Sequence, residues 1–483
     1  MNLCNINHSF NYELEKLCRI FFPFEKINIL NNEEASDFYA VSKLCGNVAY
    51  AKLYINGAVY EHRSVCISEA QKDVELGVAT ALFNCFVEAT DYRPEWGLLT
   101  GVRPVKLYMR MLETVGFEKT ERYFKERLFV SDEKLTLCRE TAEPEHKITS
   151  DNSRASFSLY VSVPFCPSRC SYCSFVSHSV DKAGKLIDDY VSLLCEELKS
   201  DAEIVEMLSL KPRTIYIGGG TPVALSAEQL DTVMSVIKAN FKLDDLCEYT
   251  VEAGRPDAIT EAKLQAIKNG GATRISVNPQ TMNDEVLSVI GRKHTAEQTI
   301  DAFNAARKAG FDNINMDLIA GLPTDTLNSF KSTLDTLLKL DPESITVHAL
   351  SIKRAANIAT SNLKIEAEAG KIAADMVRYA NTTLKAAGIL PYYLYRQSKT
   401  LGNLENVGYA KKGYEGLYNV YIMDETHTIL ACGASAVTKL REPGGNCIER
   451  IFNFKYPYEY ISRFSEMLDR KKGIERFYGQ YPI

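Results

Sequence analysis

The sequence predicts an α/β protein built around an incomplete barrel of about six βα units, with an N-terminal α+β domain and a small C-terminal unit. From Phe157 onward, short apolar runs of strand length alternate with amphipathic helical segments. The earlier residues instead carry a hairpin signal, and a chain of 483 residues is too long for one ordinary core. We therefore expect three parts, at residues 1–150, 151–390 and 391–483.

The N-terminal part is expected to contain a hairpin followed by helices. Asn56-Gly57 separates two strand-like runs and is a pair favoured in two-residue type I′ turns. A helix is expected at about residues 69–90, and another should begin at Pro104, because proline is favoured in the first helical turn. The polar stretch 141–156 carries a proline and is expected to be a linker.

The barrel strands are placed at the apolar runs, and capping boxes mark two of the helices between them. Ser226 with Gln229, and Thr295 with Gln298, have the capping-box spacing. After residue 391 we expect a tyrosine-rich segment, a hairpin across Asp424-Glu425 and a final helix near 456–472. The expected strands are 157–163, 214–218, 248–253, 273–277, 313–319 and 344–350.

The composition is typical of a soluble globular protein, with 46% hydrophobic and 24% charged residues. A net charge of −6 gives no general attraction to nucleic acid, so no nucleic-acid partner is expected. Neither a signal peptide nor an apolar run long enough to cross a membrane is evident, which predicts a cytoplasmic protein without membrane insertion. Thirteen cysteines in such a protein are better explained as thiols and metal ligands than as disulfides.

Three of the cysteines lie close together in the sequence. Cys166, Cys170 and Cys173 follow the first expected barrel strand, in a loop with two prolines. Three thiolates can hold a 4Fe-4S cluster and leave one iron open for a cofactor or substrate. The alternatives are a structural zinc site with His178 as fourth ligand, or a chance group of buried cysteines.

A glycine run follows the second expected strand. Gly218, Gly219 and Gly220 precede Thr221 and Pro222, and no Lys-Ser or Lys-Thr follows as a phosphate-binding P-loop requires. A run without side chains lets a ligand approach the backbone, although a tight turn alone has the same pattern.

Other polar residues fall at or after strand ends, where the chemistry of such barrels is located. Glu252 is placed to accept both hydroxyls of a ribose, or to be solvated. Gln280, Arg292 and Asp317 are each equally consistent with scaffold pairing and with ligand contact. His348 is expected to be a core histidine, and the tyrosines at 392, 393 and 395 are expected to pack.

Several motifs in this order resemble the oxygen-independent coproporphyrinogen III dehydrogenase branch of the radical S-adenosylmethionine (SAM) enzymes. They are YVSVPFCPSRCSYCSF, YIGGGTP, TVEAGRPD, RISVNPQTMN, IGRKH and NMDLIAGLP, between about residues 157 and 350. The segments WGLLTGVRPVK and NVGYAKKGYEGLYNVYIMDE are similar to HemZ-type members in particular.

The resemblance implies a partial (βα)6 TIM-type radical SAM barrel that carries a 4Fe-4S cluster on Cys166, Cys170 and Cys173. It also implies a cytoplasmic oxidoreductase of haem biosynthesis, which forms a 5′-deoxyadenosyl radical from SAM and decarboxylates two propionates of coproporphyrinogen III. A reductant such as flavodoxin or ferredoxin is the implied partner. The implied SAM contacts are Tyr160, Gly219, Gly220, Thr221, Glu252, Gln280, Arg292 and Asp317.

One position departs from the dehydrogenase pattern. Dehydrogenases of this branch typically have a further cysteine two places after the third ligand, where this chain has Phe175. Relatives that resemble haem chaperones share the replacement. The alternatives are therefore a haem-binding chaperone or another radical SAM enzyme acting on a tetrapyrrole. Candidate cations for the propionates are Arg169, Arg255, Lys411 and Lys412.

Overall fold

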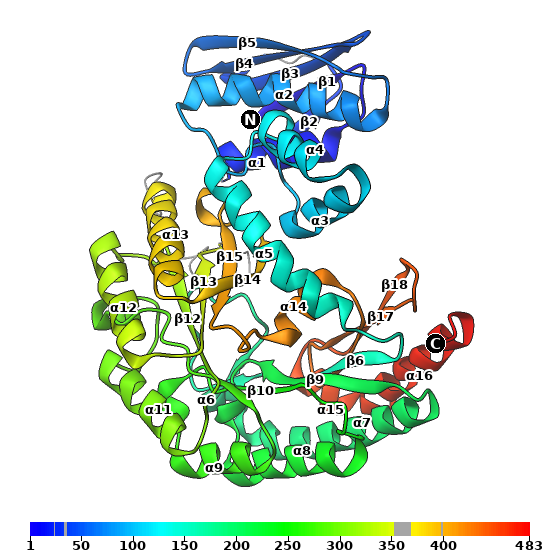
Figure 1. Cartoon of the computed structure of the whole chain (residues 1–483), viewed down its shortest axis with the longest axis vertical. Helices are drawn as coiled ribbons and strands as arrows, with labels where there is room; N and C mark the ends of the chain where they lie inside the picture. The colour runs from blue at the N-terminus through cyan, green and yellow to red at the C-terminus, as the bar shows by residue number, and fades with distance from the viewer. Residues whose placement is uncertain (24, 33–35, 352–368, 398) are drawn as a thin grey trace. The chain divides into compact units, whose positions relative to one another are not determined.

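The computed structural model describes residues 1–23, 25–32, 36–351, 369–397 and 399–483 (Figure 1). The chain forms two compact units. One combines Met1–Glu140 with Arg396–Glu405, and the other combines Thr141–Tyr395 with Asn406–Ile483. No helix among the described residues is both long enough and apolar enough to cross a membrane.

The first unit contains a five-stranded sheet of order β2-β1-β3-β4-β5. The Asn56-Gly57 hairpin is confirmed, with both residues at positive φ (53° and 78°) as a type I′ turn requires. The helices expected near 69–90 and from Pro104 are confirmed as α2 and α3. The elements are β1 (Asn2–Ile6), α1 (Asn11–Phe21), β2 (Asn28–Leu30), β3 (Phe38–Cys45), β4 (Val48–Ile55), β5 (Ala58–Val65), α2 (Gln71–Thr90), α3 (Pro104–Val115) and α4 (Phe117–Arg122).

A buried polar network in this unit explains part of the WGLLTGVRPVK segment. The indole N–H of Trp96 donates to Glu405 at 2.7 Å, and the ammonium of Lys134 pairs with the same carboxylate at 2.6 Å. Gly97 has a positive φ of 51°, and a Cβ there would lie 2.0 Å from the carbonyl oxygen of Leu128. The segment therefore holds residues 396–405 in place, which is a structural role.

The expected linker at 141–156 is wrong for most of its length. Helix α5 (Asp132–Ser150) continues through it and contains Pro144. Thr141 and Ala142 are buried, and the carboxylate of Glu145 accepts the backbone N–H of Leu394 at 3.1 Å. Tertiary packing of one face thus outweighs the polar composition that indicated a loop.

The second unit contains an eleven-stranded sheet of order β14-β15-β13-β12-β11-β10-β9-β6-β16-β17-β18. The six expected barrel strands are all confirmed, and they run parallel in chain order. Their bounds are β6 (Ser156–Val163), β9 (Lys211–Gly219), β10 (Glu248–Glu252), β11 (Arg274–Ser276), β12 (Ile314–Ala320) and β13 (Ser344–Ala349).

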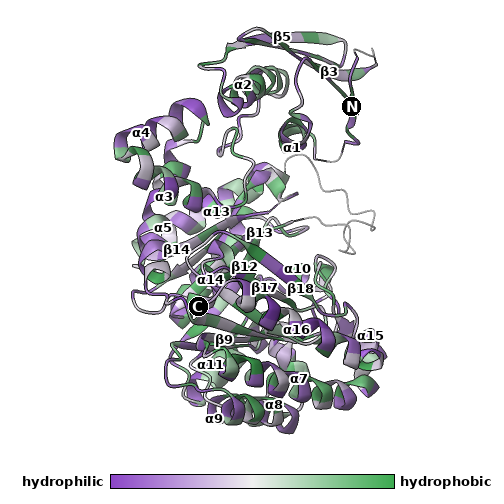
Figure 2. Cartoon of the chain, turned by 90° about the vertical axis from the view of Figure 1, so that its right-hand side faces the viewer, coloured by the Kyte–Doolittle hydropathy of each residue, from purple (hydrophilic) through white to green (hydrophobic). Residues whose placement is uncertain are grey.

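Helices cover the outer face of these strands (Figure 1). Both expected capping boxes are confirmed, at the starts of α8 and α11. In Figure 2 the helices around the sheet carry polar residues on one face and hydrophobic residues on another. The helices are α7 (Ile187–Met207), α8 (Ala227–Asn240), α9 (Glu261–Asn269), α10 (Asp284–Val289), α11 (Ala296–Lys308), α12 (Leu327–Leu340) and α13 (Ala369–Ala386).

The segment after residue 390 extends the sheet at both edges. The expected hairpin across Asp424-Glu425 is wrong, because helix α14 (Leu417–Asp424) ends there and Glu425 takes the left-handed cap position. Strand β16 then pairs in parallel with β6, and the antiparallel turns come later. The elements are β14 (Leu390–Arg396), β15 (Glu405–Ala410), β16 (Thr428–Cys432), β17 (Val437–Arg441), β18 (Ile448–Phe452), α15 (Pro457–Ser462) and α16 (Phe464–Gln480).

Candidate active site

The three clustered cysteines lie in one loop that is held at both ends. Cys166 belongs to the short strand β7 (Phe165–Cys166), which follows β6 and pairs with β8 (His178–Ser179). The backbone N–H of His178 donates to the carbonyl of Pro164 at 2.9 Å and closes the loop. Cys166 and Cys170 are buried, and Cys173 is partly exposed. The loop therefore presents its thiols from a fixed frame.

The thiols affect one another electrostatically. The pKa of Cys173 is raised to about 11, because burial and the nearby Cys170 and Cys166 raise it more than Arg169 lowers it. Yet these sulfurs and His178 do not gather within 4.8 Å of one another. Among the described residues only Glu197, Asp201 and Cys432 form such a compact set. The three sulfurs and His178 therefore lack the close approach that the four ligands of a single zinc ion have.

The glycine run lies against the cysteine loop. A Cβ at Gly220 would lie 2.6 Å from the carbonyl oxygen of Phe165 and 3.0 Å from the sulfur of Cys166. The backbone N–H of Thr221 donates to Phe165 at 2.8 Å, and its hydroxyl donates to Cys166 Sγ at 3.4 Å. Gly219 has a φ of 107°, in the left-handed region that favours glycine. The chain's own cysteine loop thus accounts for these glycines.

Polar side chains line the inside of the parallel strands. Strands β6, β10, β12 and β13 are buried except at one position each, and these positions are Tyr160, Glu252, Asp317 and His348. His348 contacts Asp317 (Nε2 to Oδ2, 3.9 Å) and the hydroxyl of Tyr395 (3.5 Å). A parallel sheet is normally apolar and buried on both faces, so these partly exposed polar positions mark an accessible interior.

The two carboxyl groups of this lining, Glu252 and Asp317, differ in their pKa values. The pKa of Glu252 is raised to about 7, because burial and the nearby Asp317 raise it more than the hydroxyl of Tyr216 lowers it. Burial opposes ionisation of Asp317 as well, but the nearby imidazole of His348 and a hydrogen bond from the amide of Asn315 lower its pKa overall. Asp317 is therefore ionised at neutral pH, whereas Glu252 titrates near pH 7.

The segment after β11 carries buried polar atoms that lack partners. Gln280 has a positive φ of 69°, and its backbone N–H donates to the carbonyl of Asp317 at 2.9 Å. Its Oε1, Asn278 Oδ1 and Arg292 Nε have no hydrogen-bond partner within the described part of the chain. Because buried polar groups are normally satisfied, these atoms fit a polar ligand.

Arg292 also fastens parts of the site to one another. Its guanidinium donates to the carbonyls of Asn278 at 2.6 Å and Gly254 at 3.1 Å, and to the hydroxyl of Tyr172 at 3.1 Å. Tyr172 lies between Cys170 and Cys173 in the sequence. Burial opposes the charge of Arg292, yet Tyr172 and Cys170 raise its pKa above the ordinary value. Arg292 therefore ties the ends of β10 and β11 to the cysteine loop.

Arg255 holds the same loop from another side. It is 3% exposed, pairs with both oxygens of Asp257 at 2.9 and 2.8 Å, and donates to the carbonyl and hydroxyl of Ser168. Arg255 is therefore already engaged and is not an available cation for a propionate. Lys411 is engaged as well, with Asp341 at 2.8 Å.

Sequence reasoning missed some of these roles. His348 was expected in the core but is partly exposed in the inner lining, whereas Tyr392 and Tyr393 pack in a buried cluster as expected. Tyr216 was not singled out. The sequence does contain a signal for Tyr216. It lies two residues before Gly218 in a strand, so both residues face the same side of the sheet, where the glycine run begins.

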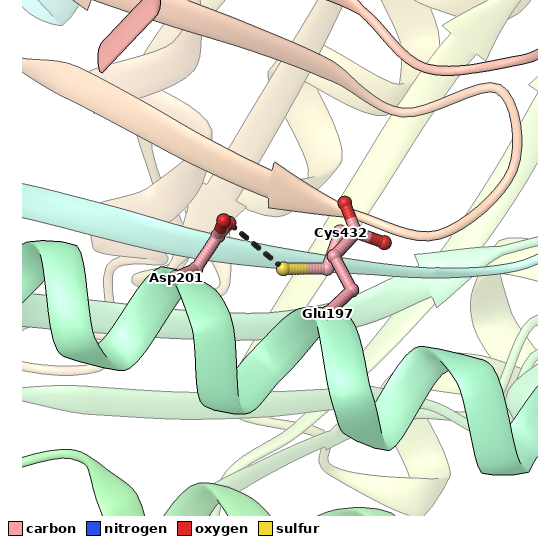
Figure 3. Close-up of side chains that lie close together, drawn as sticks. All are labelled: Glu197, Asp201 and Cys432. Atoms are coloured by element: carbon pink, nitrogen blue, oxygen red, sulfur yellow. Dashed lines mark hydrogen bonds between the residues drawn. The ribbon is translucent and has the colours of Figure 1, made fainter. Parts of the chain in front are cut away.

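The Glu197, Asp201 and Cys432 cluster is a structural network (Figure 3). The ammonium of Lys471, on α16, lies 2.7 Å from Asp201 and 3.0 Å from Glu197, and also donates to the carbonyl of Ala431. The thiol of Cys432 donates to Asp201 at 3.2 Å. A lysine thus supplies the positive charge that a metal would supply, and the network joins α16 to α7 and β16.

The partial barrel, with its cysteine loop at the end of the first strand, defines the class of protein. The profile of the radical SAM superfamily matches residues 160–337. The solved structure of the radical SAM enzyme coproporphyrinogen III oxidase (HemN) from Escherichia coli has a TM-score of 0.53 at 22% identity, covering 68% of this chain and 73% of that one. This likeness supports the fold.

Proteins with similar sequences show which branch of the radical SAM family this chain belongs to. The oxygen-independent coproporphyrinogen-III oxidase-like protein HemZ of Bacillus subtilis is 37% identical over 85% of this chain and 83% of the relative. The heme chaperone HemW of Escherichia coli is 29% identical over 66% of this chain and 78% of the relative. The chain belongs to the HemZ-type branch of the radical SAM family, which uses a 4Fe-4S cluster and SAM.

Proposed function

We propose that this protein is a radical SAM oxidoreductase that converts coproporphyrinogen III to protoporphyrinogen IX. The observation that carries the proposal is the packing of Cys166 against Gly220 and Thr221, which follow β9, the strand next to β10 and its Glu252. The likeness to HemZ over most of both chains supports the substrate class. In this proposal Cys166, Cys170 and Cys173 ligate the cluster.

The remaining residues divide the binding of SAM among them. Gly219, Gly220 and Thr221 would bind the methionine end, because their backbone already lies at the cysteine loop. Glu252 would accept the ribose hydroxyls. Tyr160, Gln280, Arg292 and Asp317 would complete the site, with Gln280 Oε1 and Arg292 Nε as the polar atoms that lack partners among the described residues.

When bound, the cluster and SAM supply a 5′-deoxyadenosyl radical. A hydrogen atom would pass from the β-carbon of a propionate to the 5′ carbon, giving 5′-deoxyadenosine, and loss of carbon dioxide and one electron from the remaining substrate radical would leave a vinyl group. The electron passes to a one-electron acceptor. The chain's part is to orient the carbon and keep water away, because positioning decides which bond reacts.

Haem binding without decarboxylation is the second candidate function. Phe175 is 67% exposed within the cysteine loop, at the position where dehydrogenases have a cysteine. An exposed aromatic ring suits a flat macrocycle. HemW relatives that match this chain are named heme chaperones.

The two functions are separated by anaerobic turnover. Reconstituted protein is incubated with coproporphyrinogen III, SAM and dithionite, and the products are analysed by mass spectrometry. Mono- and divinyl products that form with 5′-deoxyadenosine support the dehydrogenase. Stoichiometric haem binding without any vinyl product would support the chaperone instead.

A further inference from the structure

We propose that Tyr216 is a positioning residue that orients the carboxylate of Glu252 for binding the ribose of SAM, with Tyr418 stacked on the ring of Tyr216. The inference rests on the ribose-binding role proposed for Glu252. It gives a role to two residues that the sequence analysis left without one, Tyr216 of the YIGGGTP motif and Tyr418 of the C-terminal segment.

The two side chains meet across adjacent parallel strands. The hydroxyl of Tyr216, on β9, donates to Oε1 of Glu252, on β10, at 2.5 Å. Gly218 leaves the space for this contact, because a Cβ there would lie 2.8 Å from the ring of Tyr216 and 3.0 Å from the carboxylate carbon of Glu252. The hydrogen bond fixes one oxygen of the carboxylate, and the second oxygen keeps its acceptor sites.

The ring of Tyr216 is held by stacking. Tyr418 stacks on it with centroids 4.5 Å apart, and Tyr160, its register partner on β6, stacks at 6.2 Å. Tyr418 lies at the start of α14, whose first backbone N–H groups donate to Glu248 at the beginning of β10. The C-terminal segment therefore sets the position of the ring, and the ring sets the position of Glu252.

The hydrogen bond from Tyr216 also affects the pKa of Glu252. Burial and Asp317 raise its pKa, while Tyr216, His348 and the backbone of Gly219 lower it. Tyr160 and Tyr418 also face the carboxylate, and both are neutral because their own pKa values are raised. A carboxylate accepts hydroxyl groups more strongly than a carboxylic acid does. Affinity for SAM should therefore rise as the pH rises through the pKa of Glu252.

The test replaces the hydroxyl alone. Tyr216→Phe keeps the ring and its stacking but removes the main group that lowers the pKa of Glu252. With SAM affinity measured by titration calorimetry on cluster-loaded protein from pH 6 to 9.5, binding should be weaker by roughly tenfold at pH 7 and recover above pH 9. Tyr418→Leu should shift the profile in the same direction by a smaller amount.

Tyr249→Phe is the matched control. Tyr249 lies on the same strand as Glu252, and its buried hydroxyl has no hydrogen-bond partner within the described part of the chain. The SAM affinity of Tyr249→Phe should depend on pH in the same way as that of the unaltered protein. A Tyr216→Phe profile that also overlays the unaltered one, or that is weaker by the same factor at every pH, overturns the inference.

Glu252→Gln separates this inference from the proposed function. It should bind SAM weakly and without pH dependence between pH 6 and 9.5. If that holds while Tyr216→Phe changes nothing, Glu252 keeps its ribose role and the positioning role of Tyr216 is wrong. If Glu252→Gln binds SAM as tightly as the unaltered protein, the ribose role fails and the inference fails with it.

Discussion

The hydroxyl of Thr221 donates to the sulfur of Cys166 at 3.4 Å, across two loops that follow neighbouring barrel strands. This contact joins the glycine run to the cysteine loop. The methionine end of SAM and the cluster would therefore be bound by one preformed corner of the barrel.

Replacing Cys166, Cys170 or Cys173 by serine should abolish SAM cleavage, because a hydroxyl is a poor ligand for iron in a sulfide cluster. Iron and sulfide content and 5′-deoxyadenosine production are the measurements. Cys195→Ser and Cys247→Ser, which lie outside the loop, should keep both. Full 5′-deoxyadenosine production by Cys170→Ser would refute its role as a ligand.

Asp257→Asn should make the cluster easier to lose. The substitution removes the charged partner of Arg255, which donates to the carbonyl and hydroxyl of Ser168 in the cysteine loop. The rate of iron release to a chelator, measured by absorbance, should be several-fold higher than in the unaltered protein. Glu261→Gln is the control, because its ion pair with Lys308 is exposed. Equal release rates for the two variants would show that Arg255 holds the loop without its carboxylate.

Lys471→Met should destabilise the second unit by about 3–5 kcal/mol, because Glu197 and Asp201 remain buried without a positive partner. Thermal and chemical unfolding followed by circular dichroism measure the change. The neighbouring Lys472→Met removes an exposed lysine and should change nothing measurable. If both variants unfold alike, the ion pairs of Lys471 with Glu197 and Asp201 are not a main stabilising contact.

The buried His427 should make the free energy of unfolding depend on pH. Burial lowers its pKa to about 3, and it is held by Ser158 at 2.7 Å and Asn152 at 3.1 Å. As the pH falls below about 6.5, the unfolded chain binds a proton at this site and the folded chain does not. Stability should therefore fall from pH 6.5 toward 3, by up to about 1.4 kcal/mol per pH unit from this residue.

The variant His427→Gln keeps hydrogen-bonding atoms but does not titrate. Its unfolding midpoint should fall less between pH 7 and pH 5 than that of the unaltered protein. Equal decreases in the two proteins would assign the acid sensitivity to other groups.

The barrel strands and the capped helices could be predicted because their signals are local. Apolar runs such as 344–350 and the spacing of Ser226 and Gln229 are read within one segment. The linker around Pro144 and the hairpin at Asp424-Glu425 were wrong because distant contacts decided them, through Glu145 and Leu394 in one case and the pairing of β16 with β6 in the other.

The site was predictable where a residue belongs to a motif. Cys166, Gly220 and Thr221 meet because the loops that carry them follow neighbouring strands. The role of Tyr216 depends on register with β10 and on a ring from α14, which lies about two hundred residues later in the chain. Tyr216 belongs to the YIGGGTP motif, but the motif does not show which side chains it contacts.

The central claim is that a propionate β-carbon is held next to the adenosyl 5′ carbon, and isotope transfer tests it most directly. Coproporphyrinogen III carrying deuterium at the propionate β-carbons is turned over anaerobically with SAM and a reductant. We predict deuterium in 5′-deoxyadenosine, together with carbon dioxide and two successive vinyl groups. Cleavage of SAM with all the label left in the porphyrinogen and no vinyl product would contradict the dehydrogenase assignment.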